Sequence, residues 1–442
     1  MAQVRDGKFA PLKIKLLWTG LFLVCFMVGR YIPIHLLHHV AEGPGAANAE
    51  LLNAANIATG GNFFHPSLFS LGLGPWMAAA ILWRFLFIGK IARNRKIPEG
   101  TVNRARNILM VALAVIQAIS LMSRYEIESL SWGPFSEEVN AQIVIVLFLV
   151  AGAVLVAWLA KKNEDLALGG ITMFILYQIV ITAGRNIQAL SITRADAHVL
   201  WFVIPACVCV VAIGVLAGNA ELRLHVNKVS IDSGYTGISY LPIKLNPAGA
   251  SPIMYALSLL VLPQYVAHAV SAVVPSTSAG VNRFLSTWGL TSPVGFTIYI
   301  LLLFALAIFF GLFTVGPKDV AERMQKGGEY FDYVPPGDAT RQYLRRRVVL
   351  LSGVSGIFLV LFTGVPLYFI GSYPHLQYLL TAPGTLMILL SLLWMLYEEI
   401  ADTMIGTKYI FTFKTASGKT ASGKTISGRA PSTKSSSSGV SA

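Results

Sequence analysis

Apolar residues are concentrated in long runs along this chain, and polar residues occupy the connections between the runs. Each run approaches or exceeds the roughly 20 helical residues that cross the ~30 Å hydrocarbon core of a bilayer. The pattern predicts ten transmembrane helices, near residues 16–33, 66–88, 103–123, 141–160, 168–190, 197–216, 250–274, 293–314, 347–371 and 383–405. The expected fold class is therefore an all-α polytopic membrane protein.

A shorter segment precedes the second run. Residues 51–60 read LLNAANIATG, and the pair Gly60-Gly61 is a natural helix stop. As a helix this segment rises only about 15 Å, half of the hydrocarbon thickness. A half-helix at membrane depth is stable only inside protein or beside a watery cavity. We expect a re-entrant half-helix inside a hollow bundle; an ordinary helix in an extracellular loop is the alternative.

Lys and Arg residues are distributed unevenly between the two sets of connections. With the N-terminus in the cytoplasm, the inside segments contain 28 of them and the outside connections three, Arg124, Arg194 and Arg283. Positive charge at the ends of membrane helices favours the cytoplasmic side. The bias predicts a multi-pass cell-membrane protein with both termini in the cytoplasm.

Two of the expected cytoplasmic loops are larger than a turn requires. Residues 217–249 contain alternating Tyr, Ile and Leu, which predicts a short hairpin. Residues 315–346 combine a short amphipathic pattern with Gly and Pro turns. Loops of this size usually dock a partner. The basic Ser/Thr/Gly/Lys tail, residues 414–442, is expected to be disordered and to act as a spacer, or to contact anionic lipid.

Composition narrows the function further. With 55% hydrophobic and 12% charged residues, a soluble domain of any size is excluded. The net charge of +13 follows from topology, so no nucleic-acid partner is expected. The sequence contains no P-loop, no HExxH and no metal-spaced His or Cys cluster, so we expect neither an enzyme nor a cofactor. The only acidic residues within the runs, Glu398, Glu399 and Asp402, lie near one helix end, which argues against ion coupling.

One charge lies within a run. Arg84 in the second run would cost about 2.5–3.5 kcal/mol at the centre of the bilayer if it faced lipid. It is therefore expected to face the bundle interior, with Gln117 of the third run as its polar neighbour. The alternative is that Arg84 snorkels to the cytoplasmic headgroups.

Four stretches resemble the SecY family of protein-conducting channels. FSLGLGPWMAAAIL resembles that family's second helix, and LPIKLNPAGASPIMYA its entry to the seventh. GLFTVGPKDVAERMQKGG and PGDATRQYL resemble the loop between helices eight and nine. The similarity extends to about Phe413. It implies two five-helix halves related by inverted pseudo-symmetry, here residues 1–190 and 191–413.

The resemblance also implies the parts of a gated pore. Residues 51–60 would be the plug, with Asn53, Asn56, Ile57 and Gly60, and the second and seventh helices would form a lateral gate that includes Arg84 and Gln117. A narrow apolar ring would block ions by dewetting yet adapt to a passing chain. The ring residues implied are Leu73, Met77, Ile171, Ile175, Met254 and Leu393 or its neighbour; ordinary core packing is the alternative for each.

The chain departs from the family pattern at three places. DLALGGITM opens the fifth helix in place of the usual Gly-Ile-Gly-Asn-Gly-Ile-Ser run. Arg84 stands where the lateral gate usually has glutamine, and Pro335 where the loop before helix nine usually has an arginine that serves the ribosome and the SecA motor. Such divergence resembles the accessory SecY paralogue of Gram-positive bacteria, which exports glycosylated serine-rich adhesins with a dedicated SecA-like motor.

The function implied is that of the central channel subunit of a preprotein translocase. Its implied partners are a SecA-like ATPase, a SecE-like small membrane subunit, the secreted preprotein (a serine-rich glycoprotein adhesin) and membrane lipids. The motor is expected to dock through Arg341, Arg345, Arg346 and Arg347. A general housekeeping SecY channel and an inverted-repeat secondary transporter or flippase are the alternatives.

Overall fold

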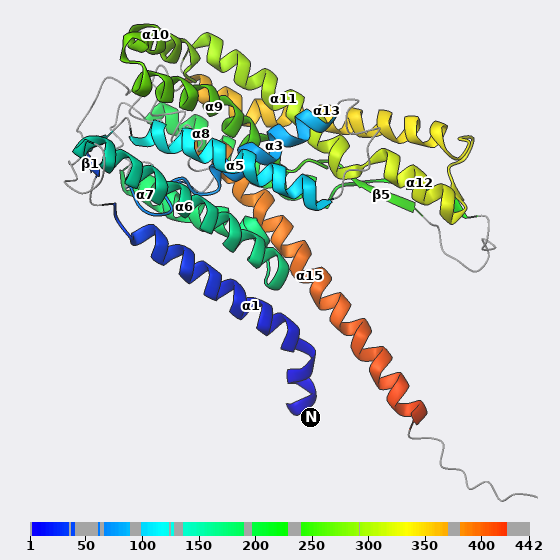
Figure 1. Ribbon diagram of the computed structural model, residues 1–442. Coiled ribbons are helices and arrows are strands. Elements are labelled where there is room, and N and C mark those ends of the chain that lie inside the picture. Colours follow the sequence, from blue (N-terminus) through cyan, green and yellow to red (C-terminus); the bar gives the residue numbers. More distant parts are fainter. Residues whose placement is uncertain are drawn as a thin grey trace, which may run out of the picture.

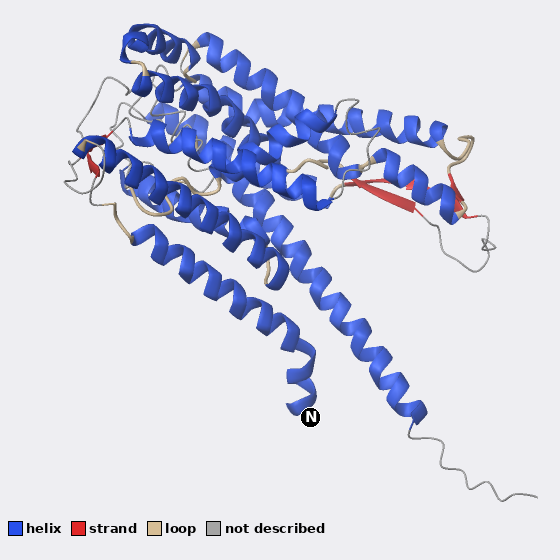
Figure 2. Ribbon diagram, viewed as in Figure 1, coloured by secondary structure: helices blue, strands red, loops and turns tan. Residues whose placement is uncertain are grey.

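The computed structural model of the protein describes residues 2–34, 37–39, 61, 66–88, 99–122, 125–127, 136–189, 197–228, 240–290, 292–369 and 381–421. Long helices dominate these ranges and pack into an elongated bundle (Figure 1), and the short strands lie at its two ends (Figure 2). The plug segment expected at residues 51–60 lies outside the described residues, as do Asn53, Asn56, Ile57 and Gly60.

Each of the ten predicted spans coincides with a helix. The helices are α1 (Ala2–Tyr31), α3 (Gly74–Ile88), α5 (Glu99–Met122), α6 (Glu137–Leu166), α7 (Gly170–Ala189), α8 (Ala197–Asn219), α9 (Ser251–Val273), α11 (Pro293–Val315), α13 (Asp338–Tyr368) and α15 (Ala382–Ala421). Seven helices in the described part of the chain are long and apolar enough to cross a membrane, and Gly170–Gly184 and Val203–Leu216 are shorter apolar stretches. The all-α polytopic fold class is confirmed.

The second span begins differently from the prediction. A helix was expected from residue 66, but residues 68–73 form successive turns and α3 begins only at Gly74. Gly72 has a left-handed backbone with φ 53°, and Ser70 Oγ accepts a hydrogen bond from the Ser67 amide at 2.6 Å. These local contacts compete with helical hydrogen bonds. Pro75, whose fixed φ suits the first helical turn, then allows the helix to start.

The two large loops form one structural unit at the end of the bundle where α1 begins and α15 ends (Figure 1). The predicted hairpin is confirmed: β3 (Glu221–His225) pairs antiparallel with β5 (Tyr240–Lys244). The predicted amphipathic helix is α12 (Pro317–Gly327). A second pairing, of β4 (Asn227–Lys228) with β6 (Glu329–Tyr330), was not predicted and joins the two loops.

This double-loop unit comprises residues 221–228, 240–244 and 316–344. It has a hydrophobic core of its own, which continues into α13 at Val348; the core residues are Leu224, Val226, Ile243, Met324, Phe331, Leu344 and Val348. Both loops contribute to this core, so they pack together as one unit.

The opposite end of the bundle is covered by smaller elements. Strand β1 (Leu37–His39) pairs antiparallel with β2 (Tyr125–Ile127). A 3-10 turn, η3 (Pro275–Thr277), leads from α9 into the amphipathic helix α10 (Ser278–Trp288). The Trp288 indole N–H donates to the Leu260 carbonyl at 2.9 Å, which attaches α10 to α9.

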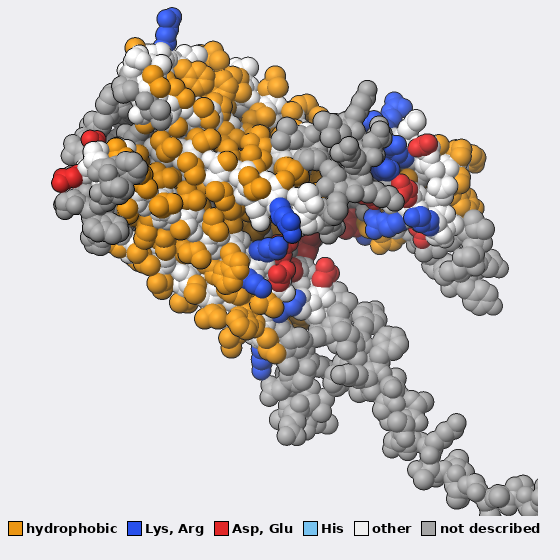
Figure 3. All heavy atoms as spheres, viewed as in Figure 1, with side chains coloured by type: hydrophobic (Ala, Val, Ile, Leu, Met, Phe, Trp, Pro, Cys, Tyr) orange, Lys and Arg blue, Asp and Glu red, His pale blue; other side chains and the backbone are white. Residues whose placement is uncertain are grey.

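The outer surface of the bundle is apolar between its two ends. Hydrophobic side chains cover the visible face, and Lys and Arg gather beyond it, toward the end where α12 lies (Figure 3). On α8 the exposed residues Trp201, Ile204, Val208, Val211 and Val215 follow one another at helical spacing. An apolar stripe of this length is typical of a helix that faces lipid or another membrane helix.

The last helix is longer than predicted. The span was expected to end near residue 405 and the tail from residue 414 to be disordered, but α15 continues to Ala421. Extending an existing helix adds one hydrogen bond per residue fixed and avoids the cost of nucleation, so a polar sequence can follow an apolar helix without a break. Residues 422–442 lie outside the described residues.

Candidate functional site

A seam between α3 and α11 holds the charge that the sequence places within the second span. The Arg84 Cζ atom lies 4.3 Å from the centroid of the Phe313 ring and 5.6 Å from that of Phe310. One residue further along α3, the Phe85 ring stacks on Phe309 with the centroids 5.1 Å apart. The C-terminal end of α3 therefore contacts α11 through one cation and one ring of its own, Arg84 and Phe85, against three rings of α11.

The partner of Arg84 differs from the predicted one. We expected Gln117 to be its polar neighbour, but the buried Gln117 Oε1 atom has no hydrogen-bond partner in the described part of the chain. The guanidinium instead faces ring quadrupoles, which attract a cation without the desolvation cost of a buried carboxylate. Phe309, Phe310 and Phe313 occupy adjacent positions on one side of α11, and this spacing was the sequence signal that could have revealed them.

The seam continues onto α9 and α5. The Tyr255 ring of α9 stacks on Phe310 with centroids 4.8 Å apart. The Arg106 Cζ atom of α5 lies 5.8 Å from the centroid of Trp76 on α3. Two guanidinium groups thus lie among aromatic rings contributed by three helices. Sequence analysis missed Arg106 because it stands beside the basic connection that precedes α5.

Two buried glutamines lie on the helices that pack across the seam. Gln117 belongs to α5 and Gln264 to α9, and these helices contact one another. The two polar side-chain atoms of Gln264 and the Oε1 atom of Gln117 lack hydrogen-bond partners among the described residues. A buried polar group without a partner costs about 1–3 kcal/mol. A polar partner for these amides would therefore stabilise the packing of α5 against α9.

Five of the six predicted ring residues join one hydrophobic cluster. Leu73, Met77, Ile175 and Met254 are buried in it, and Ile171 packs against it partly buried. The cluster joins α3, α7 and α9, which belong to the two halves that the sequence analysis expected. These five residues therefore all belong to or pack against one apolar core that several helices share.

The sixth ring position was predicted as Leu393 or its neighbour, and of these two Leu393 is not in the cluster. Its side chain is 43% exposed and lies outside the cluster, whereas the preceding residue, Leu392, is 8% exposed and belongs to it. Successive helical residues are rotated by about 100°, so neighbours in the sequence face different directions. Leu392 is the residue that α15 contributes near this position.

A polar junction lies beside the end of the expected plug. Gln178 of α7 is buried, and its Nε2 group donates to the Gly61 carbonyl at 2.9 Å and to Thr182 Oγ1 at 3.0 Å. Its Oε1 atom accepts a hydrogen bond from the Arg30 guanidinium at the end of α1. Gln178 therefore links α1, α7 and the residue that follows the segment 51–60.

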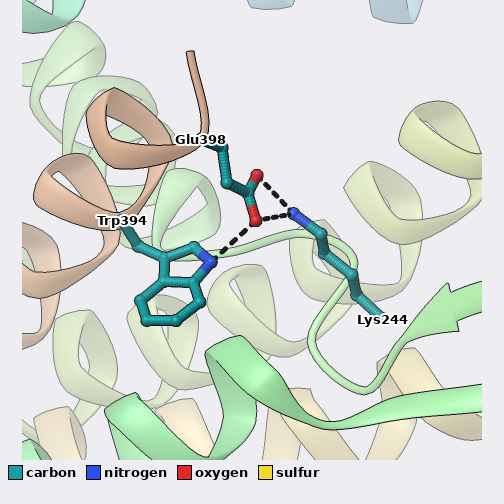
Figure 4. Close-up of polar contacts among 3 residues, drawn as sticks. All are labelled: Lys244, Trp394 and Glu398. Atoms are coloured by element: carbon teal, nitrogen blue, oxygen red, sulfur yellow. Dashed lines mark hydrogen bonds and ion pairs between the residues drawn. The ribbon is translucent and has the colours of Figure 1, made fainter. Parts of the chain in front are cut away.

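Two acidic residues of α15 accept hydrogen bonds from neighbouring loops. Glu398 accepts hydrogen bonds from the Lys244 ammonium at the end of β5 and, at 2.7 Å, from the Trp394 indole (Figure 4). Glu399 Oε2 accepts from the Gly169 amide at 2.9 Å, in the turn between α6 and α7. Because Lys244 lies just before α9, this ion pair fixes the base of the double-loop unit to α15. It also lines a cavity of about 330 Å³ between α8, α15 and the start of α9.

The four predicted docking arginines lie on the first turns of α13 but are not equivalent. Arg341 pairs with Asp338 at 3.7 Å, and the Arg347 Cζ atom lies 5.3 Å from the Tyr343 ring centroid. Arg345 and Arg346 are exposed and form no ion pair with any described residue. They lie on one face of α13 with Asp338, Arg341, Gln342 and Val349. These two are the arginines whose charge is free to meet a partner.

Comparison with known sequences identifies related chains. Residues 67–396 match the family model described as SecY. The chain is 34% identical over 407 residues to the "Accessory Sec system protein translocase subunit SecY2" of Leuconostoc gelidum subsp. gasicomitatum, covering 90% of this chain and 96% of the relative. It is 29% identical over 404 residues to the subunit of the same name from Streptococcus sanguinis, covering 91% of this chain and 98% of the relative.

Solved structures with the same fold are also found. "The structure of a protein conducting channel" aligns with a TM-score of 0.63 at 20% identity, covering 89% of this chain and 93% of that one. "Sec61 in the Canine ribosome-channel complex from the endoplasmic reticulum" aligns with a TM-score of 0.57 at 19% identity, with the same coverage. At these identities the likeness establishes the fold.

Proposed function

This chain belongs to the SecY family as the channel subunit of a preprotein translocase, and we propose that it serves an accessory export system with its own motor. Its substrate in this proposal is a serine-rich glycoprotein adhesin, and its motor a SecA-like ATPase. The relatives from Leuconostoc and Streptococcus, both named as accessory Sec system subunits, support the proposal. The chain lies in the membrane with the double-loop unit and both termini on the cytoplasmic side, as the positive charges favour.

The observation that carries the mechanism is the contact of Arg84 with Phe313. It closes a seam between α3 and α11, and α9 lies beside both helices. In the proposed gate, α3 and α5 separate from α9 and α11 so that a signal helix can enter the lipid. Separation removes the cation–π contacts of Arg84. It also allows the side-chain amides of Gln117 and Gln264 to form new hydrogen bonds. The gate therefore opens when the entering signal helix compensates for the loss of the aromatic contacts of Arg84.

The pore in this proposal is sealed by apolar side chains and by the plug. The ring consists of Leu73, Met77, Ile171, Ile175 and Met254, with Leu392 in place of Leu393. Their location in one buried cluster supports this assignment, since a continuous apolar constriction excludes water and ions. The plug is segment 51–60, and Gln178 holds its C-terminal end through the Gly61 carbonyl.

The motor docks on the double-loop unit and the adjoining turns of α13. Arg345 and Arg346 supply free positive charge there, while Arg341 and Arg347 are partly engaged within the chain. The Glu398–Lys244 pair then transmits the position of the docked motor to α15 and to the start of α9. A SecE-like subunit and membrane lipids cover the apolar outer faces, such as the stripe on α8 that begins at Trp201.

Reconstitution tests the proposed function directly. The chain, with a SecE-like subunit copurified from native membranes, is placed in proteoliposomes and supplied with ATP and either of two motors, the accessory SecA-like ATPase or the housekeeping SecA. We expect a serine-rich preprotein to become protease-protected with the accessory motor only. Equal transport of that preprotein and a general secretory protein with the housekeeping SecA would favour the alternative of a general channel.

A further inference from the structure

A fully exposed tyrosine lies in the turn of the double-loop unit that precedes α13. Tyr333 occupies the turn between Phe331 and Val334, and its side chain contacts essentially nothing in the described part of the chain. Its φ is 61°, and within the described residues it is the one residue other than glycine with a positive φ. Left-handed backbone is disfavoured for a residue with a Cβ atom, and glycine or asparagine normally takes such a position.

The surrounding contacts hold this turn in place from both sides. The Val334 amide donates to the Phe331 carbonyl at 3.2 Å, and the Phe331 ring is buried with its centroid 5.3 Å from that of Tyr343. Asp332 accepts a hydrogen bond from the Asn227 side chain, which joins the turn to the other loop. Beyond the turn, Thr340 Oγ1 donates to the Pro335 carbonyl at 2.9 Å.

The Tyr333 side chain therefore makes no visible contribution to the stability of the fold, and its left-handed backbone conformation lowers that stability. A strained residue kept in position by a rigid frame is a signal of function rather than of stability. A tyrosine presents a large, rigid, amphipathic surface at a low entropic cost, and tyrosines are enriched among the residues that dominate binding energy at protein interfaces. The frame fixes the backbone at Tyr333 before any partner arrives, so binding has to order only the two torsions of its side chain.

We propose that Tyr333 is the anchor through which the channel binds its cytosolic ATPase motor, and that the motor receives the ring in an apolar pocket with an acidic rim. The inference rests on the proposed function, because the SecA-like ATPase is the motor assigned there. The acidic rim follows from charge, since the exposed Arg345 and Arg346 flank the same unit without partners among the described residues. Binding then has two parts, an aromatic anchor that is insensitive to salt and an arginine contact that salt screens.

Substitutions at position 333 can separate binding from folding. Tyr333→Gly and Tyr333→Asn remove the ring but suit a left-handed backbone, so the turn should form as well as before or better. Tyr333→Phe keeps the ring. Tyr240→Thr is the matched control, since Tyr240 is also exposed on the double-loop unit but its ring is covered by the Arg223 guanidinium 4.8 Å away.

The measurement is the affinity of the purified accessory SecA-like ATPase for the full-length channel in nanodiscs. We expect Tyr333→Gly and Tyr333→Asn to weaken binding by about 10- to 30-fold, the size typical of an interface anchor. Tyr333→Phe and Tyr240→Thr should stay within about twofold of wild type. At high salt the loss caused by Tyr333→Gly should persist. Unchanged affinity for Tyr333→Gly, or an equal loss for Tyr240→Thr, would overturn the proposal.

A crosslinking arm distinguishes failure of the anchor from failure of the proposed motor. Benzoylphenylalanine at position 333 should crosslink to the SecA-like ATPase in cells, and the same group at position 240 should not. If the wild-type channel binds that ATPase but position 333 does not crosslink to it, the assignment of Tyr333 as the anchor is wrong, whereas the assignment of the motor is retained. If position 333 crosslinks to a ribosomal component or to lipid, and the wild type does not bind the ATPase, the motor assignment and the anchor both fall.

Discussion

The guanidinium carbon of Arg84 lies 4.3 Å from the centre of the Phe313 ring, so a positive charge of α3 rests on an aromatic face of α11. The two helices come from opposite halves of the chain, and this contact lies between them. When the helices separate, Arg84 must find another partner or face lipid, which costs about 2.5–3.5 kcal/mol at mid-bilayer. In the proposed gate, the contact is expected to make the closed state more stable than an apolar seam would.

A double-mutant cycle on this pair is expected to show that it acts as one unit. Arg84→Gln and Phe313→Leu each remove a cation–π interaction of about 2 kcal/mol, which corresponds to roughly 30-fold in the ratio of closed to open channel. Each variant should export a general Sec substrate more readily than wild type. The double variant should gain little beyond either single one, whereas fully additive gains would mean that the two residues act independently.

Polar substitutions in the apolar ring are expected to make the channel leak. Met77→Asn, Ile175→Asn and Met254→Asn each place an amide in the constriction, which wets it and raises ion conductance in planar bilayers. The controls are Val180→Asn on α7 and Val266→Asn on α9, whose side chains are exposed on the same helices. A similar leak from ring and control variants would show that the ring is ordinary core.

The last helix offers a sharper comparison for the ring. Leu392→Asn should raise conductance and Leu393→Asn should not, because only Leu392 belongs to the buried cluster. This is also where sequence alone reached its limit. The apolar run that includes both leucines predicts a helix, but its rotation about its own axis depends on packing against other helices.

Other differences from the sequence-based expectations have the same origin in long-range contacts. The spans followed from runs of apolar residues, and the β3–β5 hairpin from local alternation. The β4–β6 pairing involves two residues in each strand, too few to carry a pattern, and they lie in separate loops. The partner of Arg84 lies on α11, far along the chain, and a neighbouring polar residue such as Gln117 was the nearest candidate that sequence could offer. The family match over residues 67–396 removes the transporter alternative that span count alone left open.

Release of the plug is expected to open the pore to ions. Deletion of residues 53–60 should leave a folded protein with raised conductance, because in the proposed function this segment closes the pore. Gln178→Leu should raise conductance to a smaller extent, because it removes the donor to the Gly61 carbonyl and the acceptor for Arg30. Thr182→Val is the control, since it leaves both of these contacts intact. Unchanged conductance after the deletion would refute the plug assignment.

Charge reversal on α13 is expected to weaken motor binding in a salt-dependent way. Arg345→Glu combined with Arg346→Glu should reduce affinity for the SecA-like ATPase most strongly at low salt, since exposed charges are screened within about 8 Å at physiological ionic strength. Arg283→Glu, on α10 at the opposite end of the bundle, controls for net charge. If affinity is undiminished at every salt concentration, these arginines set topology only.

The central claim is that α3 and α11 must separate for export, and a reversible bridge between them tests it most directly. Phe85 and Phe309, stacked with centroids 5.1 Å apart, are replaced by cysteines in a chain whose Cys25, Cys207 and Cys209 are serines. A bifunctional maleimide with a disulfide spacer then joins the helices, and export of the native preprotein into vesicles is measured. The account predicts that bridging stops export and that reduction of the spacer restores it. Export at the full rate through the bridged channel would contradict it.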